Sequence, residues 1–485
     1  MKVAAETFAL TPRVGAVGRS LTAAKIERVF SPIKTTLTLL ESDGERLCII
    51  SSHFMTHYYH FSNILRRRVA DRLSLPIERV IDFSSHNHCT PKLVTRQYAF
   101  GSTERETPPN KSILTPEGRD LVDHAEAAAA RLVDRLEAVE VRWGLGHERR
   151  ISHNRKGHRA DGSTYMMREA DRLKLGADFN GDIDDDAPIL GFYAADGAPR
   201  CFLAHFTAHP VTAYDPERPV VFGEYAQVAC DALSEAMGGV PVGFLQGCAG
   251  DVNAKGLLAD LPVEQKIADA TRYGHCLVQA WIDGISRATV SERTTLGIQR
   301  RIVELPFTDV PPLEELNDQI ADMEAFIQRC ADNDPDTLTC QGLNFPANMT
   351  PRYRSVLVEP LLRWAKWARA FHTENRLNEA PRAAEFEVVA LRIGDAGIVG
   401  LSCEPFDAIG RQIKRSSPLP ITLPCGYMHD TCLGYVPDSG NNGDREYMSA
   451  FYRYTTSMLP YAQPAGDRLA AAAVEMLSEL AEARA

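Results

Sequence analysis

The stretch Val80-Ile81-Asp82-Phe83-Ser84-Ser85-His86-Asn87-His88 places two histidines directly after an apolar run. Upstream, Leu47-Cys48-Ile49-Ile50 predicts a strand and Phe61 to Leu73 an amphipathic helix, so that Val80 to Phe83 completes a β-α-β unit. Because side chains alternate along an extended segment, His86 and His88 should project to the same side. The pair is typical of a metal site, and its alternative is a polar rim of solvated or hydrogen-bonded histidines.

Three further apolar runs end in groups that can bind a metal or react. Cys201 to Ala204 leads to His209-Pro210, Val242 to Leu245 leads to Asp251-Val252-Asn253, and Ile398 to Leu401 leads to Glu404-Pro405. In open α/β sheets, functional groups collect beyond the carboxyl ends of the strands. We therefore predict an α/β fold with a central sheet and one shared crevice, although each dipeptide taken singly is also typical of a turn.

Composition sets limits on the class of protein. The chain has 485 residues, of which 44% are hydrophobic and 24% charged, as expected for a soluble globular protein with a large core. A formal net charge of -11 without a basic stripe argues against nucleic acid as a partner. The chain lacks a run of about eighteen apolar residues and a signal-like N-terminus, which predicts no membrane insertion and a cytoplasmic location. Its eleven cysteines are scattered without a Cys-x-x-Cys pair, which fits reduced thiols.

We expect one α/β domain over residues 1–485, because no linker, low-complexity run or internal repeat divides the chain. Within it, Pro312 to Cys330 and Pro351 to Thr373 have helical patterns, separated by the turn-rich segment Asp332 to Asn348. Residues 311–375 are therefore predicted as a helical insertion. It is either a lid over the crevice or a peripheral helical hairpin.

The order of these segments resembles the neutral or alkaline non-lysosomal ceramidases and their bacterial relatives over most of the chain. Besides His86-Asn87-His88, the resemblance rests on Phe8 to Gly15, Asn154-Arg155-Lys156, Asp184 to Leu190, Ala208-His209-Pro210, Gln246 to Asn253 and Gly434-Tyr435-Val436. It implies a mixed α/β catalytic domain. Longer ceramidases carry a C-terminal immunoglobulin-like domain, which we expect to be absent here, because this chain ends in the helical pattern of Asp467 to Ala485.

The resemblance also implies a zinc site held by His86, His209, Glu404 and Tyr435. Neutral imidazoles and oxygen donors suit zinc, and so few protein ligands leave a position for water or substrate. A site rich in oxygen and without thiolate also suits Mn²⁺ or Fe²⁺. Tyr435, which follows a glycine, has packing or hydrogen bonding as its alternative role.

The chain departs from the family where the reaction is concerned. The serine of Gly-Asp-x-Ser is the proposed nucleophile of characterised ceramidases, whereas this chain has Asn253, and Cys89 to Leu93 replaces a glycine-rich stretch. A carboxamide cannot replace a hydroxyl nucleophile, but it can donate a hydrogen bond to a developing oxyanion or to substrate. We therefore expect a metal-activated water, whose pKa zinc lowers from about 15.7 to about 7, and a substrate other than ceramide.

Three more residues receive roles within this mechanism. His88 is the expected general acid or base. Arg155 is expected to hold an oxygen or carboxylate of the substrate through its planar donors, with a surface salt bridge as the alternative. Asp251 is expected to orient a ligand histidine, unless it is an ordinary turn or helix-cap aspartate.

A second site tyrosine is implied by the resemblance. The family's spacing from Tyr435 gives Tyr447, but Ser439 to Asp444 resembles a rearranged or lengthened loop, which favours Tyr452.

These observations together predict a metal-dependent hydrolase that cleaves an amide or related polar bond of a small soluble substrate, such as an N-acylated or sugar-like compound. One alternative is a metal-dependent glycosidase or lyase acting on a sugar-like compound, since Lewis-acid chemistry does not fix the bond that breaks. Another is a non-catalytic binding protein that a metal stabilises. The sequence leaves open whether the chain forms a homo-oligomer.

Overall fold

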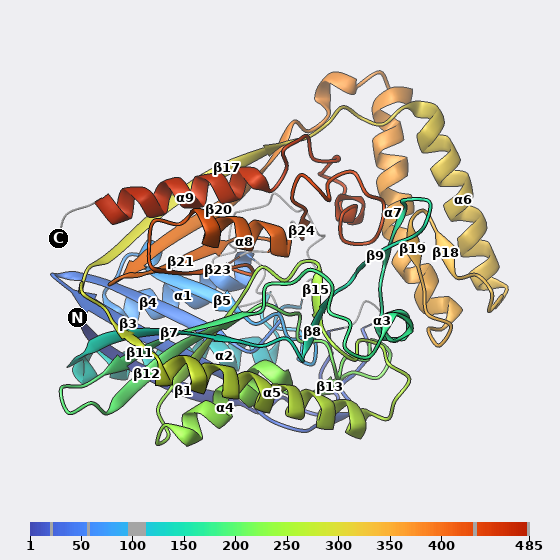
Figure 1. Ribbon diagram of the computed structural model, residues 1–485. Coiled ribbons are helices and arrows are strands. Elements are labelled where there is room, and N and C mark those ends of the chain that lie inside the picture. Colours follow the sequence, from blue (N-terminus) through green and yellow to red (C-terminus); the bar gives the residue numbers. More distant parts are fainter. Residues whose placement is uncertain (20–22, 56–58, 96–112, 430–433, 483–485) are drawn as a thin grey trace.

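The computed structural model describes residues 1–19, 23–55, 59–95, 113–429 and 434–482. In this part of the chain, three sheets of four or five strands surround one apolar core, and helices cover their outer faces (Figure 1). The predicted α/β class is confirmed. The strands expected in one central sheet are instead divided among these three sheets.

The first sheet contains the predicted β-α-β unit and has the order β5-β4-β3-β1-β6. Its strands and the helices that cover it are β1 (Lys2–Leu10), β3 (Ile33–Ser42), β4 (Glu45–Ser52), β5 (Val80–Ser84), β6 (Glu137–Ala138), α1 (Tyr59–Leu73) and α2 (Pro116–Leu132). Strands β4 and β5 are parallel, with Ile49 opposite Ile81. Cys48 and Ile50 pack toward the helices, whereas Ile49 faces the shared core. Because both faces of the sheet are buried, its strands have continuous apolar runs.

The other two sheets are likewise covered by helices on their outer faces. The second has the order β14-β12-β11-β7-β16 and the third the order β17-β20-β21-β23. The second consists of β7 (Glu140–His147), β11 (Asp186–Tyr193), β12 (Pro199–Phe206), β14 (Val242–Gln246) and β16 (Thr289–Val290), with α4 (Glu224–Ala236) and α5 (Val263–Ser286) outside it. The third consists of β17 (Leu296–Pro306), β20 (Ala383–Ile393), β21 (Ala396–Leu401) and β23 (Ile421–Cys425), with α8 (Asp407–Ser416) and α9 (Asp467–Glu482) outside it.

The three sheets share the core between them. Phe83 of β5, Leu203 of β12 and Ile398 of β21 belong to one buried apolar cluster. Backbone bridges between Phe83 and Met428, and between Gly247 and Cys425, join neighbouring sheets where their strands end. The segments after β5, β12, β14 and β21 are thereby brought to one region of the molecule.

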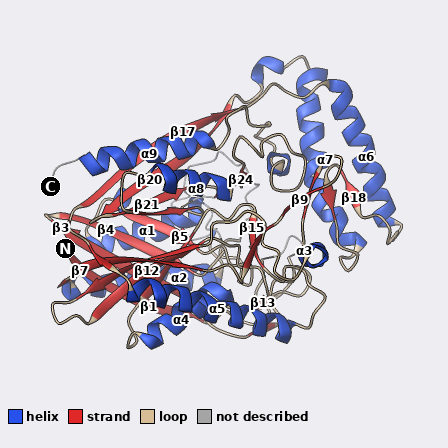
Figure 2. Cartoon of the chain, viewed as in Figure 1, coloured by secondary structure: helices blue, strands red, loops and turns tan. Residues whose placement is uncertain are grey.

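Two long helices lie beside each other, apart from the sheets (Figure 2). They are α6 (Leu313–Ala331) and α7 (Pro351–Thr373), close to the predicted helical patterns. The Thr350 hydroxyl accepts a hydrogen bond from the Tyr353 backbone N–H at 3.3 Å and so caps α7. Phe326, Leu361 and Trp364 lie in an apolar cluster that the two helices share. That residues 311–375 form an insertion within a single domain stays a prediction. No helix among the described residues has the length and apolar character needed to cross a membrane.

Candidate metal centre

Three side chains from different sheets converge at the strand ends. His86 follows β5, His209 follows β12, and Glu404 lies in the short strand β22 (Glu404–Pro405) after β21. Glu404 Oε2 is 3.3 Å from His86 Nε2 and 3.2 Å from His209 Nε2. Bonds of about 2.0–2.2 Å to a tetrahedral ion separate ligand atoms by about 3.3–3.6 Å. The residues present therefore fit a metal ion in both donor type and spacing.

A turn in the backbone directs the His86 side chain toward Glu404 and His209. His86 has φ +62°, in the left-handed region, and its side chain is buried. This conformation costs an L-residue about 1–2 kcal/mol, and histidine is among the types that tolerate it best. The geometry differs from the extended strand end predicted from side-chain alternation, yet His86 and His88 still face one site, with ring centroids 4.9 Å apart.

Backbone carbonyls orient the second histidine. His209 Nδ1 donates to the Ala249 carbonyl at 2.5 Å, which leaves Nε2 with a lone pair toward Glu404. The Asp251 carboxylate, expected to orient a ligand histidine, instead accepts hydrogen bonds from the Asp407 backbone N–H at 2.7 Å and from Asn154 Nδ2 at 2.8 Å. Asp251 therefore braces the loop around the site and does not touch the ring.

Burial keeps the histidines neutral. Desolvation lowers the pKa of His86, His88 and His209 well below the ordinary value of 6.5, and the Glu404 carboxylate opposes this only for His86. A neutral imidazole is the form that binds metal.

The third imidazole offers an alternative set of ligands. One nitrogen from each of His86, His88 and His209 lies within 4.8 Å of the others. Nε2 of His88 has no hydrogen-bond partner among the described atoms. The geometry thus provides either two histidines with Glu404 or three histidines, and in the first case leaves His88 free to exchange protons.

Tyr435 lies next to these groups. The short strand β24 (Tyr435–Val436) pairs with β22, and this register sets Tyr435 beside Glu404. The Tyr435 ring is 6.1 Å from the His209 ring, and its hydroxyl accepts a hydrogen bond from Arg155 Nη2 at 2.9 Å. Burial raises the pKa of Tyr435 well above 10. Arg155 is thus a buried residue of the site and does not form the surface salt bridge considered as its alternative.

One tyrosine at the centre was missed by the sequence analysis. The Tyr427 hydroxyl lies 3.4 Å from His209 Nε2, and its ring centroid is 4.5 Å from that of His86. Tyr427 follows β23 and has φ +58°. No motif around it signals this position.

A cavity of about 600 Å³ opens onto the histidines. Its polar end contains His88, His209, Arg155 and Tyr435. The remaining wall is rich in apolar and aromatic side chains, among them Met166, Val211, Leu257, Leu258, Leu343, Phe345, Met349, Val356, Leu357 and Phe451. Because several of these residues come from α7, that helix forms part of the cavity wall, as the lid alternative requires.

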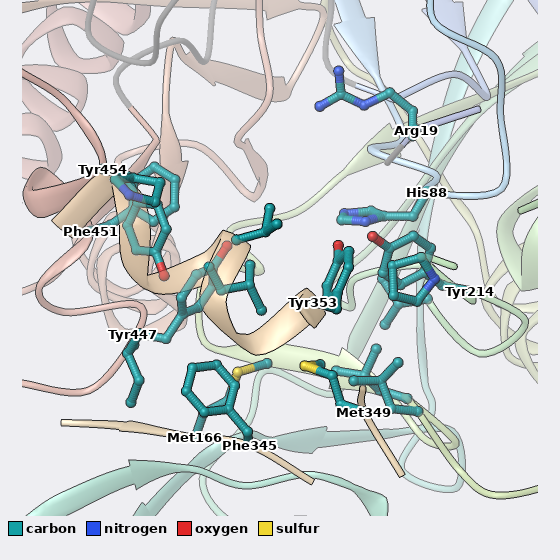
Figure 3. A pocket seen from close by; sticks show the side chains of 18 of the residues that line it. Arg19, His88, Met166, Tyr214, Phe345, Met349, Tyr353, Tyr447, Phe451 and Tyr454 are labelled. Atoms are coloured by element: carbon teal, nitrogen blue, oxygen red, sulfur yellow. The ribbon is translucent and has the colours of Figure 1, made fainter. Parts of the chain in front are cut away.

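Two tyrosines next to His88 come from distant segments. Tyr214 and Tyr353 are hydrogen-bonded to each other, and the Tyr214 ring packs edge-on against His88 at 4.8 Å. Figure 3 shows both hydroxyls turned toward His88. Tyr353 belongs to α7, so the helical segment reaches the site itself.

The structure brings Tyr447 to the site, not Tyr452. Tyr447 lines the cavity and is hydrogen-bonded to Tyr435, with ring centroids 5.6 Å apart. Tyr452 packs edge-on against Trp364 of α7 at 5.2 Å and is absent from the cavity wall. The helical turn Phe451–Tyr454 causes this, because it directs Phe451 and Tyr454 to the cavity and Tyr452 to the opposite side.

Asn253 lies beside His209 but behind the cavity wall. The short strand β15 (Val252–Ala254) contains Asn253, which bridges to His209 and pairs with His153 of β8 (Ser152–Asn154). Paired residues share a face, so the Asn253 side chain projects on the His209 side. It is fully buried, and neither of its amide atoms has a hydrogen-bond partner in the described structure.

Comparison with known proteins gives the fold a class. No family model matches the chain, and no curated protein matches it. Among solved structures, neutral ceramidase from Pseudomonas aeruginosa matches 99% of this chain and 74% of its own, with a TM-score of 0.65 and 16% identity. A structure described as a ceramidase complexed with C2 matches 99% and 75%, with a TM-score of 0.64 and 15% identity. The chain therefore has the fold of the neutral ceramidases.

Proposed function

We propose that this protein is a metal-dependent hydrolase that cleaves an amide or related polar bond of a small molecule. The observation that carries the proposal is that Glu404 Oε2 lies 3.3 Å from His86 Nε2 and 3.2 Å from His209 Nε2, and that His209 lines a cavity. Burying a carboxylate without a cation is costly, and a divalent ion compensates that cost.

His86, His209 and Glu404 would hold the ion, with Tyr435 beside them. When bound, a zinc ion supplies Lewis acidity and lowers the pKa of a water molecule, and Mn²⁺ or Fe²⁺ are the alternatives. His88 faces the same point with an unpartnered Nε2, so it is suited to move a proton between water and leaving group. The hydroxyls of Tyr435 and Tyr447 can hold the scissile oxygen, because Arg155 and the Tyr435–Tyr447 hydrogen bond position them.

The amide class comes from likeness of fold to proteins described as ceramidases, together with the motif order. Asn253 occupies the position of the proposed serine nucleophile, so ceramide is not part of this proposal. The cavity of about 600 Å³ has the size of a small-molecule site, and its apolar wall suits a substrate with an apolar portion. The described cysteines are free thiols, which supports a reducing compartment such as the cytoplasm.

Elemental analysis of purified variants tests the proposed ligands. We expect about one transition-metal ion per wild-type chain, and near-complete loss of it in His86→Ala and in His209→Ala, because binding depends on the assembled set. His147→Ala is the matched control, since His147 lies in an exposed group of ligand-type side chains and should leave the metal content unchanged. Undiminished metal in both cavity variants would contradict the proposal.

A further inference from the structure

The cavity wall contains an arginine without a partner. Arg168 is only 8% exposed and lines the cavity, and no hydrogen bond or ion pair of its guanidinium is found among the described residues. Its Nε is fully buried and unpartnered. A buried charge of this kind is expensive unless something compensates it.

Other buried arginines of the described chain do not share this property. Each donates to a carbonyl or carboxylate of the protein: Arg66 to Val80, Arg155 to Gly250, Arg172 to Glu169, Arg354 to Thr337, Arg392 to Gly394 and Arg453 to Gln341. The nearby Asp171 carboxylate attracts the Arg168 charge but makes no hydrogen bond with its guanidinium; its oxygens accept from Lys174 Nζ and from the backbone N–H of Arg168. Among the described residues, the Arg168 guanidinium therefore has no acceptor, which leaves it available to an anion in the cavity.

Arg168 lies close to the reacting end of the cavity. A hairpin of β9 (Lys156–His158) and β10 (Thr164–Met166) separates it from Arg155, and the Met167 backbone N–H donates to the Arg155 carbonyl at 2.6 Å. The Arg155 guanidinium in turn reaches Tyr435. A group bound by Arg168 would thus lie in the same cavity as His209, Arg155 and Tyr435.

The charge around the cavity has the matching sign. Arg19, Lys92 and Arg155 also line it, and Glu359 is the one acidic residue among the lining residues that the structure describes. Burial lowers the pKa of Arg168 to about 10, because the opposing attraction of the Asp171 carboxylate is too weak to offset it and Arg155 adds a further repulsion; a bound anion would raise this pKa again. This cationic interior contrasts with a net charge of -11 for the whole chain.

We propose that the substrate carries a carboxylate that the Arg168 guanidinium binds, so that the cleaved compounds are N-acylated amino-acid-like molecules. Arginine presents two parallel donors that match a carboxylate, which favours this planar anion over a single point charge. The acyl portion packs against the apolar wall of Met166, Phe345 and Met349, which Figure 3 shows together along one side of the cavity. Cleavage of such a compound rests on the proposed hydrolase function, whereas binding of its carboxylate to Arg168 does not.

Binding of a defined probe tests the inference. The protein as purified is titrated with N-octanoylglycine, its methyl ester and octyl phosphate, by calorimetry, and hydrolysis of the first two is measured in parallel. We expect wild type to bind the free acid more tightly than the neutral ester, and Arg168→Met to lose about 10- to 100-fold in affinity for the acid alone. Arg168→Lys keeps the positive charge but lacks the two parallel donors of the guanidinium, so its affinity for the acid should lie between those of Arg168→Met and wild type. Arg287→Met, at an exposed arginine, is the control for loss of one positive charge.

The outcomes separate this inference from the proposed function. Arg168-dependent binding of the acid without hydrolysis would support the anion site and count against the hydrolase. Equal affinity of wild type for acid and ester, or an unchanged preference in Arg168→Met, would overturn the anion site even if both compounds were hydrolysed. Tighter Arg168-dependent binding of octyl phosphate than of the acid would overturn the assignment to a carboxylate. If Arg168→Met does not fold, an affinity for the acid in Arg168→Lys equal to wild type would overturn the bidentate contact.

Discussion

In the part of the chain that the structure describes, two places bring the ligand atoms of three ligand-type side chains within 4.8 Å of one another, and the two places differ in how those side chains are partnered. His86, His88 and His209 lie at the base of the cavity, whereas His147, Asp185 and Asp186 lie at the surface. In the surface group, Asp185 lies 3.3 Å from Arg149 and Asp186 lies 3.1 Å from Lys414. Cations of the protein therefore already pair with both carboxylates.

The cavity group has no such compensation. Glu404 is buried, and its Oε2 contacts two imidazoles whose pKa values burial lowers, so no protein cation neutralises it through these contacts. Both groups therefore consist of ligand-type side chains at similar spacing, while burial and unused bonding capacity distinguish the group that we propose binds a metal ion.

The largest effect is expected for His88→Ala, in the buried group of ligand-type side chains. Turnover should fall by about 10²- to 10⁴-fold, the usual contribution of a positioned acid or base, while metal content and fold stay intact. Steady-state kinetics on a hydrolysed N-acyl compound measures the rate, and elemental analysis measures the metal content. Release of the metal would instead assign His88 to the ligands, and an unchanged rate would remove it from the mechanism.

A smaller effect is expected at Asn253. Asn253 is paired with His209 through the backbone but does not line the cavity, and its amide makes no hydrogen bond among the described residues, so Asn253→Ala should lower kcat by no more than about 10-fold, with little change in metal content. Steady-state kinetics with metal analysis tests this. A wild-type protein inactive on every amide, but converted to a ceramidase by Asn253→Ser, would refute catalysis by an activated water.

The smallest effect concerns a buried carboxyl away from the proposed ligands. Burial raises the pKa of Glu224 from 4.5 to about 7. The folded state therefore keeps a proton that the unfolded state releases above about pH 4.5, and wild-type stability falls as pH rises toward 7. Glu224→Gln does not ionise, so its free energy of unfolding relative to wild type should rise by on the order of 2 kcal/mol between pH 5 and pH 8. Urea unfolding at the two pH values measures this difference, and a pH-independent difference would contradict the raised pKa.

The sequence was most informative where both faces of a strand are buried. The apolar run Val80 to Phe83 corresponds to β5 (Val80–Ser84), and Ile398 to Leu401 lies within β21 (Ala396–Leu401), because continuous apolar runs have few other stable arrangements. The amphipathic pattern from Phe61 to Leu73 likewise predicted most of α1 (Tyr59–Leu73).

Other parts of the site depend on packing that no local pattern encodes. Tyr214, Tyr353 and Tyr427 reach the histidines from two loops and a helix, and nothing in their neighbouring residues distinguishes them from core tyrosines. Whether Tyr447 or Tyr452 reaches the site depends on the helical turn Phe451–Tyr454, which lies in an irregular segment. That the Arg168 guanidinium has no hydrogen-bond acceptor among the described residues can be recognised only from the folded structure, because an absent contact has no sequence signature.

The positions of the proposed ligands along the chain have a consequence for folding. Residues 86, 209 and 404 follow strands of three different sheets, so the loops closed by their meeting are long and the contacts are non-local. The centre can therefore form only after most of the chain has folded, and a fragment that ends before residue 404 has no centre to form. A bound ion would also slow unfolding, because its ligands follow strands of three different sheets. Any separation of the sheets there would have to release the ion first, so that metal dissociation, rather than the apolar core, would govern how long the folded protein persists.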